Sequence, residues 1–201
     1  MPGASAARWH SLYVGQGWSA DPERDRAKAV ELAARAIELD PQNALALATH
    51  GHLRSFLFHD YDSALTYFDR ALAACPSHSL AWMLSVSTLS YVGRAEEAIR
   101  HGERALRLSP LDRSLFTYYS SLSLAHYAGA SYEEAAKGGR LSMNENPLYT
   151  SNLRYLSAAL AALDKIDEAQ AVATQLLRQE PEFRISTYSR TRQPFRHPEM
   201  H

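Results

Sequence analysis

The 201-residue sequence predicts an all-α fold, a right-handed α-solenoid built from about five antiparallel helix pairs. Five of its nine prolines recur at nearly constant spacing, with 35, 34, 37 and 34 residues between successive members. Small residues stand at fixed distances before each of these prolines, and the apolar residues between them follow helical periodicity. A repeat of about 34 residues is typical of solenoids, in which each unit packs only against its neighbours. The five prolines are Pro41, Pro76, Pro110, Pro147 and Pro181.

The second helix of each repeat is marked by the residues twelve and five positions before its proline. Nine of these ten positions carry alanine or a similarly small residue, and Leu176 is the exception. Small side chains seven residues apart lie on one face of a helix, where they let a neighbouring helix approach closely. The proline then ends the helix, because the residue before a proline is disfavoured in the α conformation. The five pairs are Ala29 and Ala36, Ala64 and Ala71, Ala98 and Ala105, Ala135 and Ser142, and Ala169 and Leu176.

Another apolar helix and a short turn precede each of these second helices. In the third repeat we expect the first helix at about residues 79–92, followed by a turn at Gly93-Arg94. The turn of the first repeat is longer, and it ends at Asp21 as the N-cap with Pro22 at the first helical position. The pattern therefore predicts about ten helices. The turns of the second, fourth and fifth repeats are expected at His59-Asp60, Gly129-Ala130 and Asp164-Lys165.

When its repeats are aligned on the five prolines, the chain resembles the tetratricopeptide repeat (TPR) family. The pattern of that family is W-x2-L-G-x2-Y, then A-x3-F-x2-A, then P. The matching residues are Trp82, Ala98, Ala105 and Pro110 in the third repeat, and Ala64, Phe68, Ala71 and Pro76 in the second. The chain departs from the pattern at Ser85 and Val86, which replace the Leu-Gly pair, and at Gly102 and Gly139, where an aromatic residue is usual. The resemblance covers roughly residues 4–181. We assign residues 1–181 to the repeat array and residues 182–201 to a basic C-terminal capping segment or tail.

A narrower resemblance concerns three short sequence segments. Residues 16–22, residues 108–112 and the ending around Pro194-Phe195-Arg196 look like TPR modules that follow bacterial class III adenylate cyclase domains or winged-helix transcriptional regulators. Neither a cyclase nor a DNA-binding domain is present in these residues. This resemblance implies that the chain is a regulatory fragment of a longer signalling protein.

Composition excludes several other classes of function. The formal net charge is −1, so generic binding to nucleic acid or to an anionic membrane is not expected. The single cysteine, Cys75, rules out an intramolecular disulfide framework. No apolar run approaches the roughly 18 residues of a membrane span, and the first seven residues lack the pattern of a signal peptide. We therefore expect a cytoplasmic protein.

Signatures of catalysis and of metal binding were not found. The sequence contains no phosphate-binding glycine loop, no nucleophile elbow and no H-E-x-x-H motif. His50, His52 and His59 cluster in sequence, but His50 and His52 are two residues apart on a predicted helix and face away from each other. We predict no enzymatic activity, no catalytic residue, no cofactor and no metal site.

The TPR resemblance implies that the first helices line a concave groove. The stripe that these helices present is neutral, with hydroxyl groups, a few aromatic rings and one arginine. We expect Tyr91 and Arg154 to be groove residues rather than core residues. The predicted partner-binding residues are His52, Ser55, Met83, Ser87, Tyr91, Thr117, Ser121 and Arg154.

Such a groove suits an extended peptide or a helix of a partner protein. Some TPR domains clamp the C-terminal carboxylate of chaperones with lysines and asparagines, but the matching positions here are Ala48, His52, Met83 and Ser87. Chaperone tails are therefore not expected as ligands, whereas self-association is possible. We predict a protein–protein interaction module, and the alternative is a regulatory domain that controls a linked cyclase or transcriptional regulator.

The tail differs from the repeats in charge. Between residues 182 and 201 four arginines stand against two glutamates, which gives +2, and aromatic residues lie between them. Because terminal repeats need a cap, we expect this segment to cover the exposed apolar face of the last repeat. Contact with an acidic partner or with nucleic acid is the alternative for the tail.

Overall fold

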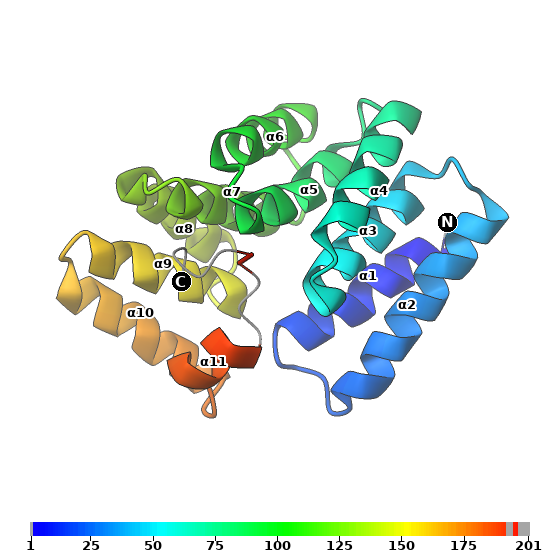
Figure 1. The fold of residues 1–201 in the computed structure, drawn as a ribbon. Coiled ribbons are helices and arrows are strands. Elements are labelled where there is room, and N and C mark those ends of the chain that lie inside the picture. The colour runs from blue at the N-terminus through cyan, green and yellow to red at the C-terminus, as the bar shows by residue number, and fades with distance from the viewer. Residues whose placement is uncertain (1, 192–194, 197–201) are drawn as a thin grey trace.

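The computed structural model describes residues 2–191, 195 and 196. These residues form eleven α-helices and no strand, which confirms the all-α prediction. The first ten helices form five antiparallel pairs, and one short helix follows the last pair (Figure 1). Their bounds are α1 Pro2–Gly15, α2 Pro22–Leu39, α3 Ala44–Phe58, α4 Tyr61–Ala74, α5 Ser79–Tyr91, α6 Ala95–Leu108, α7 Leu115–Ala128, α8 Tyr132–Glu145, α9 Thr150–Ala162, α10 Ile166–Gln179 and α11 Ile185–Thr191.

The second helix of every repeat ends two residues before its proline, as the repeat pattern predicts. Helix α4, for example, ends at Ala74, and Cys75 is its C-cap before Pro76. The small residues that define the register are all buried, and the most exposed of the ten, Ala169, is 8% exposed. These positions therefore face neighbouring helices, and the register read from the prolines is correct.

The turns between the paired helices lie where the sequence places them. Each of the four short turns contains one residue in the left-handed region, with φ of 53° at His59, 80° at Gly93, 55° at Ala130 and 59° at Asp164. In the longer first turn the side chain of Asp21 accepts a hydrogen bond from the backbone N–H of Arg24, so Asp21 caps α2 as expected.

The two glycines that depart from the repeat pattern are explained by leucines of the following repeat. A Cβ at Gly102 would lie 2.7 Å from Cδ2 of Leu122, and a Cβ at Gly139 would lie 2.9 Å from Cδ1 of Leu156. Leu122 is on α7 and Leu156 is on α9, so each leucine reaches back to the second helix of the repeat before it. The space that an aromatic residue usually occupies is thus filled from the next repeat.

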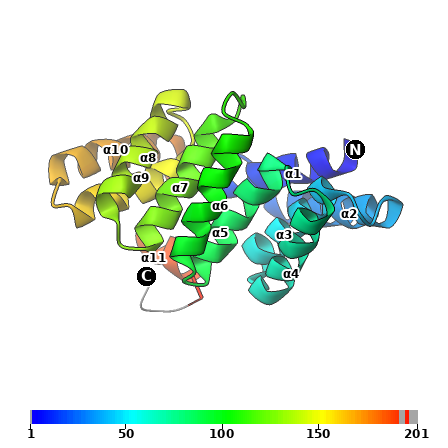
Figure 2. The ribbon, with the colours of Figure 1, turned by 90° about the horizontal axis from the view of Figure 1, so that it is seen from above.

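The array curls so that the end of α1 comes close to α9 and α11, while α2 and α10 lie on opposite sides of the molecule (Figure 1 and Figure 2). The loop between α1 and α2 approaches the first turn of α9 and the end of α10, where Gln16 hydrogen-bonds with Thr150 and Ser151. The concave side is therefore enclosed by a ring of helices, whereas the TPR resemblance implied only a concave groove. Contacts between residues 134 or 135 positions apart make this closure, and a repeat pattern carries no information about them.

The C-terminal segment contacts the last repeat and also the concave side of the array. Ile166 and Leu177 on α10 remain 46% and 44% exposed, so the described part of the segment does not cover them. Instead Tyr188 on α11 lies against Arg154, and Phe195 is buried against Tyr91. Phe183, in the same segment, packs against the apolar cluster of α9 and α10. That residues 182–201 cap the last repeat stays a prediction.

Candidate functional site: the concave chamber

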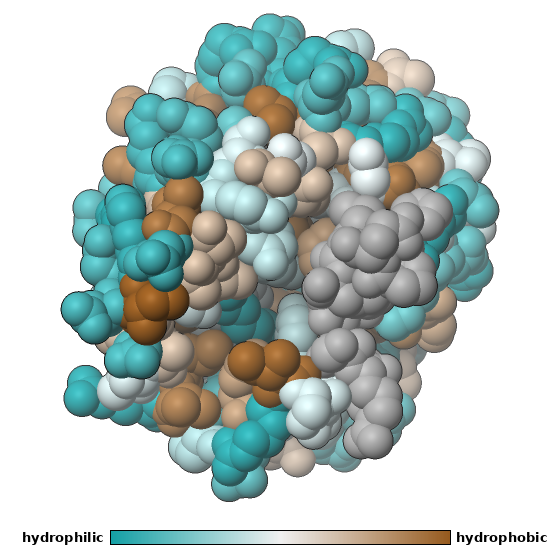
Figure 3. All heavy atoms as spheres, turned by 60° about the vertical axis from the view of Figure 1, so that its left-hand side comes forward, coloured by the Kyte–Doolittle hydropathy of each residue, from teal (hydrophilic) through white to brown (hydrophobic). Residues whose placement is uncertain are grey.

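The five first helices surround a cavity of about 390 Å³, here called the concave chamber. Helices α1, α3, α5, α7 and α9 all contribute to its wall, together with the α1–α2 loop and Tyr188 of α11. This volume is in the range of sites that bind small molecules or short peptide segments. The face of the molecule drawn in Figure 3 shows separate apolar patches among hydrophilic side chains. Leu141 and Leu148 are among the exposed large apolar residues, at 42% and 51% exposure. The chamber is the cavity to which the first helices of all five repeats contribute.

Seven of the eight predicted partner-binding residues line the chamber. Ser55 does not: it is 1% exposed, and its buried hydroxyl has no hydrogen-bond partner among the described residues. Phe56, four residues after His52 on α3, and His59, the C-cap of α3, line the chamber in its place. The seven lining residues are His52, Met83, Ser87, Tyr91, Thr117, Ser121 and Arg154.

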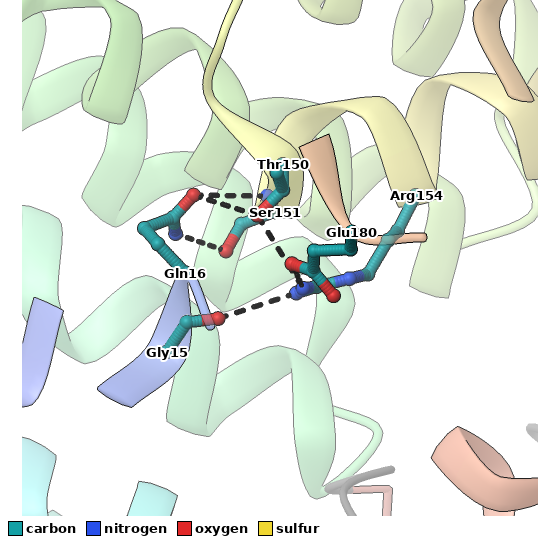
Figure 4. Close-up of polar contacts among 6 residues, drawn as sticks. All are labelled: Gly15, Gln16, Thr150, Ser151, Arg154 and Glu180. Atoms are coloured by element: carbon teal, nitrogen blue, oxygen red, sulfur yellow. Dashed lines mark hydrogen bonds and ion pairs between the residues drawn. The ribbon is translucent and has the colours of Figure 1, made fainter. Parts of the chain in front are cut away.

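Polar contacts between the first and fifth repeats close one side of the chamber (Figure 4). Nε2 of Gln16 donates to Oγ of Ser151 at 2.7 Å, and Oε1 of Gln16 accepts from Oγ1 of Thr150 at 2.8 Å. The backbone N–H of Ser151 also donates to Oε1 of Gln16, at 3.4 Å. Gln16 is 1% exposed, so its amide depends on these partners.

Arg154 is an internal link rather than a free groove residue. Its guanidinium forms an ion pair with Glu180, and the two side chains are 7% and 9% exposed. Nη1 of Arg154 also donates to the backbone oxygen of Gly15 at 3.5 Å, so the same arginine contacts the other end of the array (Figure 4). The rings of Phe183 and Tyr188 lie 5.6 and 5.2 Å from its guanidinium carbon. The interpretation of Arg154 as groove rather than core is therefore wrong.

Tyr91 is also buried, at 6% exposure. Burial raises the pKa of its hydroxyl above the ordinary range, and hydrogen bonding with Tyr155 and Ser87 only partly opposes this rise. The phenol is therefore neutral at physiological pH. Its ring meets Phe195 edge to face at 5.7 Å, so Tyr91, like Arg154, belongs both to the chamber wall and to the folded core.

The chamber wall carries more arginines than the sequence predicts. Arg8 and Arg26 line it in addition to Arg154, and no aspartate or glutamate occurs among the described lining residues. The charge of Arg154 is compensated by Glu180, and Arg26 pairs with Glu23 at 3.4 Å. Arg8 and Arg26 both belong to the first repeat, which faces the others only because the ring closes. The expectation of a neutral groove with one arginine is corrected accordingly.

His52 carries no charge in this environment. Burial lowers its pKa from 6.5 to about 4, and the neighbouring Arg8 acts in the same direction. The imidazole can therefore donate one hydrogen bond and accept another at pH 7. Together with the hydroxyls of Ser87, Thr117 and Ser121, it equips the wall for hydrogen bonding to main-chain groups of a ligand.

The described residues contain no group of three or more histidine, cysteine, aspartate or glutamate side chains placed to hold a metal ion. Over the same residues no helix is long and apolar enough to cross a membrane.

Comparison with known proteins identifies the fold. No family model matches the chain. The chain is 29% identical over 124 residues to the protein STIP1 homolog of Dictyostelium discoideum, covering 62% of this chain and 21% of that protein. It is 30% identical over 95 residues to anaphase-promoting complex subunit 3 of Schizosaccharomyces pombe, covering 47% of this chain and 14% of that protein. The chain thus spans about a fifth or less of the length of these two curated relatives.

Three solved structures have the same architecture. PilW, a type IV pilus biogenesis factor, superimposes with a TM-score of 0.70 at 14% identity over 92% of this chain and 80% of PilW. MamA from Desulfovibrio magneticus gives 0.59 at 18% identity over 89% of this chain and 96% of that chain. YrrB, described as a TPR protein with an unusual peptide-binding site, gives 0.56 at 14% identity over 92% and 90%. The chain therefore has the α-solenoid fold of TPR proteins.

Proposed function

We propose that this chain is a protein-interaction module that binds an extended segment of a partner protein in the concave chamber. One observation carries the proposal: the first helices of all five repeats direct side chains into one chamber that apolar residues do not fill. Among the described residues, the lining combines hydroxyl groups, tyrosine rings and arginines, and it lacks the convergent acid, base and nucleophile that a catalytic site needs. Such a wall suits a ligand with both main-chain amides and apolar side chains.

An extended segment fits better than a helix. A helix with its side chains is about 10–12 Å across, and the chamber is narrowed by the α1–α2 loop and by Tyr188. A helix would enter only if the contacts between Gln16 and α9 were broken. An extended peptide is narrower, and its amides are free to pair with Ser87, Thr117 and Ser121.

The test is selection from a library of random 12-residue peptides displayed on phage, with the 201-residue chain as bait. Ser121→Phe fills part of the chamber, and Ser77→Phe places the same side chain on an exposed loop outside it. We expect peptides that bind the unmodified chain and the Ser77→Phe variant but bind the Ser121→Phe variant at least tenfold more weakly. The proposal fails if no peptide is enriched, or if the enriched peptides bind both variants equally.

A second candidate function is the regulation of a linked domain in a larger signalling protein, such as an adenylate cyclase or a transcriptional regulator. It is favoured by the C-terminal segment, which already contacts the concave side through Tyr188 and Phe195. A segment of the same polypeptide can therefore occupy the surface that a partner would use. An immunoblot of source cells tests this candidate, because it requires a native band clearly larger than the 201-residue chain.

A further inference from the structure

Phe195 occupies a pocket that is formed by residues far away in the sequence. Its side chain is 8% exposed and belongs to an apolar cluster with Tyr61, Tyr91 and Leu124. Tyr91 meets the Phe195 ring edge to face at 5.7 Å, and Tyr61 meets Tyr91 in the same way at 6.5 Å. The pocket walls come from α4, α5 and α7, whereas the phenylalanine comes from the end of the chain.

Arg196 makes three further contacts beside this pocket. Its backbone N–H donates to the backbone oxygen of Tyr91 at 2.8 Å. Nη2 of its guanidinium donates to Oδ1 of Asp62 at 2.8 Å, and the guanidinium carbon lies 5.1 Å from the centre of the Tyr61 ring. Tyr91 is the last residue of α5, where the helix dipole also favours a positive charge. We call Tyr61, Asp62, Tyr91 and Leu124 the aromatic–arginine site.

These contacts recognise two consecutive residues by three independent means. An apolar pocket accepts the ring, a backbone oxygen fixes the main chain, and a carboxylate with a tyrosine face accepts the guanidinium. A main-chain hydrogen bond combined with side-chain pockets is the usual way in which proteins bind extended peptides. The receptor groups lie on α4, α5 and α7, and their contacts to the two residues are non-covalent, so a separate peptide chain can in principle make the same contacts.

We propose that the aromatic–arginine site is a recognition site for a Phe-Arg sequence in an extended segment of a partner protein. Phe195 and Arg196 are its built-in occupant, and the partner segment takes their place. The site shares Tyr91 and Leu124 with the wall of the chamber, whereas Tyr61 and Asp62 do not line the chamber. This inference goes beyond the proposed function, because it can hold whether or not the chamber itself accepts a peptide.

The test uses a fluorescently labelled peptide with the sequence of residues 192–198, RQPFRHP, and fluorescence anisotropy. The full chain with Phe195→Ala and Arg196→Ala has an empty site and should bind this peptide saturably. The unmodified chain should bind it at least tenfold more weakly, because its own segment competes at a high effective concentration. The peptides RQPARHP and RQPFEHP should each bind the double variant at least tenfold more weakly than RQPFRHP.

Variants of the receptor side make the test specific. Asp62→Asn in the background of the double variant should weaken binding of RQPFRHP several-fold, whereas Asp69→Asn should leave it unchanged. Both aspartates are exposed on α4, so neither change affects the core. Adding Ser121→Phe should also leave binding unchanged, which separates this site from the chamber.

Two results would overturn the proposal. One is the absence of saturable binding to a double variant whose circular dichroism and melting match those of the unmodified chain. The other is equal binding of RQPFRHP and RQPARHP. If the double variant does not fold, Arg196→Ala alone replaces it, because the Arg196 side chain is 37% exposed and its loss leaves the core intact. That single variant should bind RQPFRHP more tightly than the unmodified chain does, and equal binding would contradict the proposal.

Discussion

Arg154 joins parts of the chain that lie far apart in the sequence. It contacts Gly15 in the first repeat, Glu180 after the last helix of the array, and Tyr188 in the C-terminal segment. A buried ion pair adds little net stability compared with apolar residues of the same size, but removal of one partner leaves a buried charge uncompensated. Loss of Arg154 therefore removes contacts with the first repeat, with the end of the array and with the C-terminal segment at once.

We predict that Arg154→Ala lowers the free energy of unfolding by about 3 kcal/mol, because Glu180 is left buried without its partner. Arg140→Ala is the matched control, since Arg140 pairs with Glu168 at 2.6 Å on the surface and water screens that pair. Urea denaturation followed by circular dichroism measures both variants. Similar losses in the two variants would show that the Arg154 pair is not buried as described.

The histidines make stability depend on pH. Burial lowers the pKa of His52 from 6.5 to about 4, and burial also lowers the pKa of His50, His78, His101 and His126. Between pH 6.5 and 4 the unfolded chain therefore binds more protons than the folded chain. Full stability is present above pH 6.5 and is lost as the pH falls through this window.

For His52 alone we expect a loss of at most about 3 kcal/mol at pH 4. His52→Gln should remove this part of the loss, so its unfolding free energy should fall less steeply between pH 6.5 and 4 than that of the unmodified chain. Urea denaturation at a series of pH values measures the slope. An unchanged slope in the variant would mean that His52 is accessible to protons in the folded chain.

At the scale of the helix pair, a glycine on one helix faces a large side chain on an adjacent helix. Gly102 and Gly139 leave room on the second helices, and Leu122 and Leu156 of the following first helices occupy it. In the second repeat the arrangement is reversed, since Phe68 is on the second helix and Gly51 on the first, and a Cβ at Gly51 would lie 3.5 Å from the Phe68 ring. Departures from the repeat pattern are thus paired with compensating residues on an adjacent helix.

This pairing predicts energetic coupling. Gly102→Leu should destabilise the chain by about 1–3 kcal/mol, because the added side chain overlaps Leu122. In a Leu122→Ala background the same change should be much less costly or even favourable. A double-mutant cycle from urea denaturation gives the coupling energy, which should reach at least about 1 kcal/mol. Additive effects would show that the two side chains do not share this space.

At the scale of the whole molecule, the closure of the ring decides access to the chamber. The described polar contacts that close it are the hydrogen bonds of Gln16 with Thr150 and Ser151 and the hydrogen bond from Arg154 to Gly15. Hydrogen bonds of this kind contribute about 1 kcal/mol each, which is small compared with the packing between adjacent repeats. The ring is therefore expected to open at Gln16 before any helix pair separates.

We expect Gln16→Ala to shift the array towards an open form while each helix pair stays folded. Small-angle X-ray scattering should show a larger radius of gyration than for the unmodified chain, and helicity by circular dichroism should be nearly unchanged. Gln42→Ala, at an exposed position in the α2–α3 loop, is the control and should change neither quantity. If the radius of gyration of Gln16→Ala is unchanged, other contacts keep the ring closed.

The repeat architecture follows from the sequence alone. The prolines, the alanines before them and the left-handed turn positions act through local geometry, so they predict where each second helix ends and which face it buries. The TPR-type fold follows from the same register, and seven of the eight residues predicted for the groove line the chamber. The eighth, Ser55, is buried instead, and Phe56 and His59 line the chamber beside His52.

Contacts between distant repeats are determined by the tertiary structure and cannot be predicted from the repeat pattern. Gln16 meets Ser151 across 135 residues, Arg154 meets Gly15 across 139, and Arg196 meets Asp62 across 134. The curvature of the array brings these residues together, and that curvature is the sum of small rotations at every interface between repeats. A periodic sequence specifies each interface but not the accumulated angle. The closed ring, the burial of Arg154 and the aromatic–arginine site therefore become visible only in three dimensions.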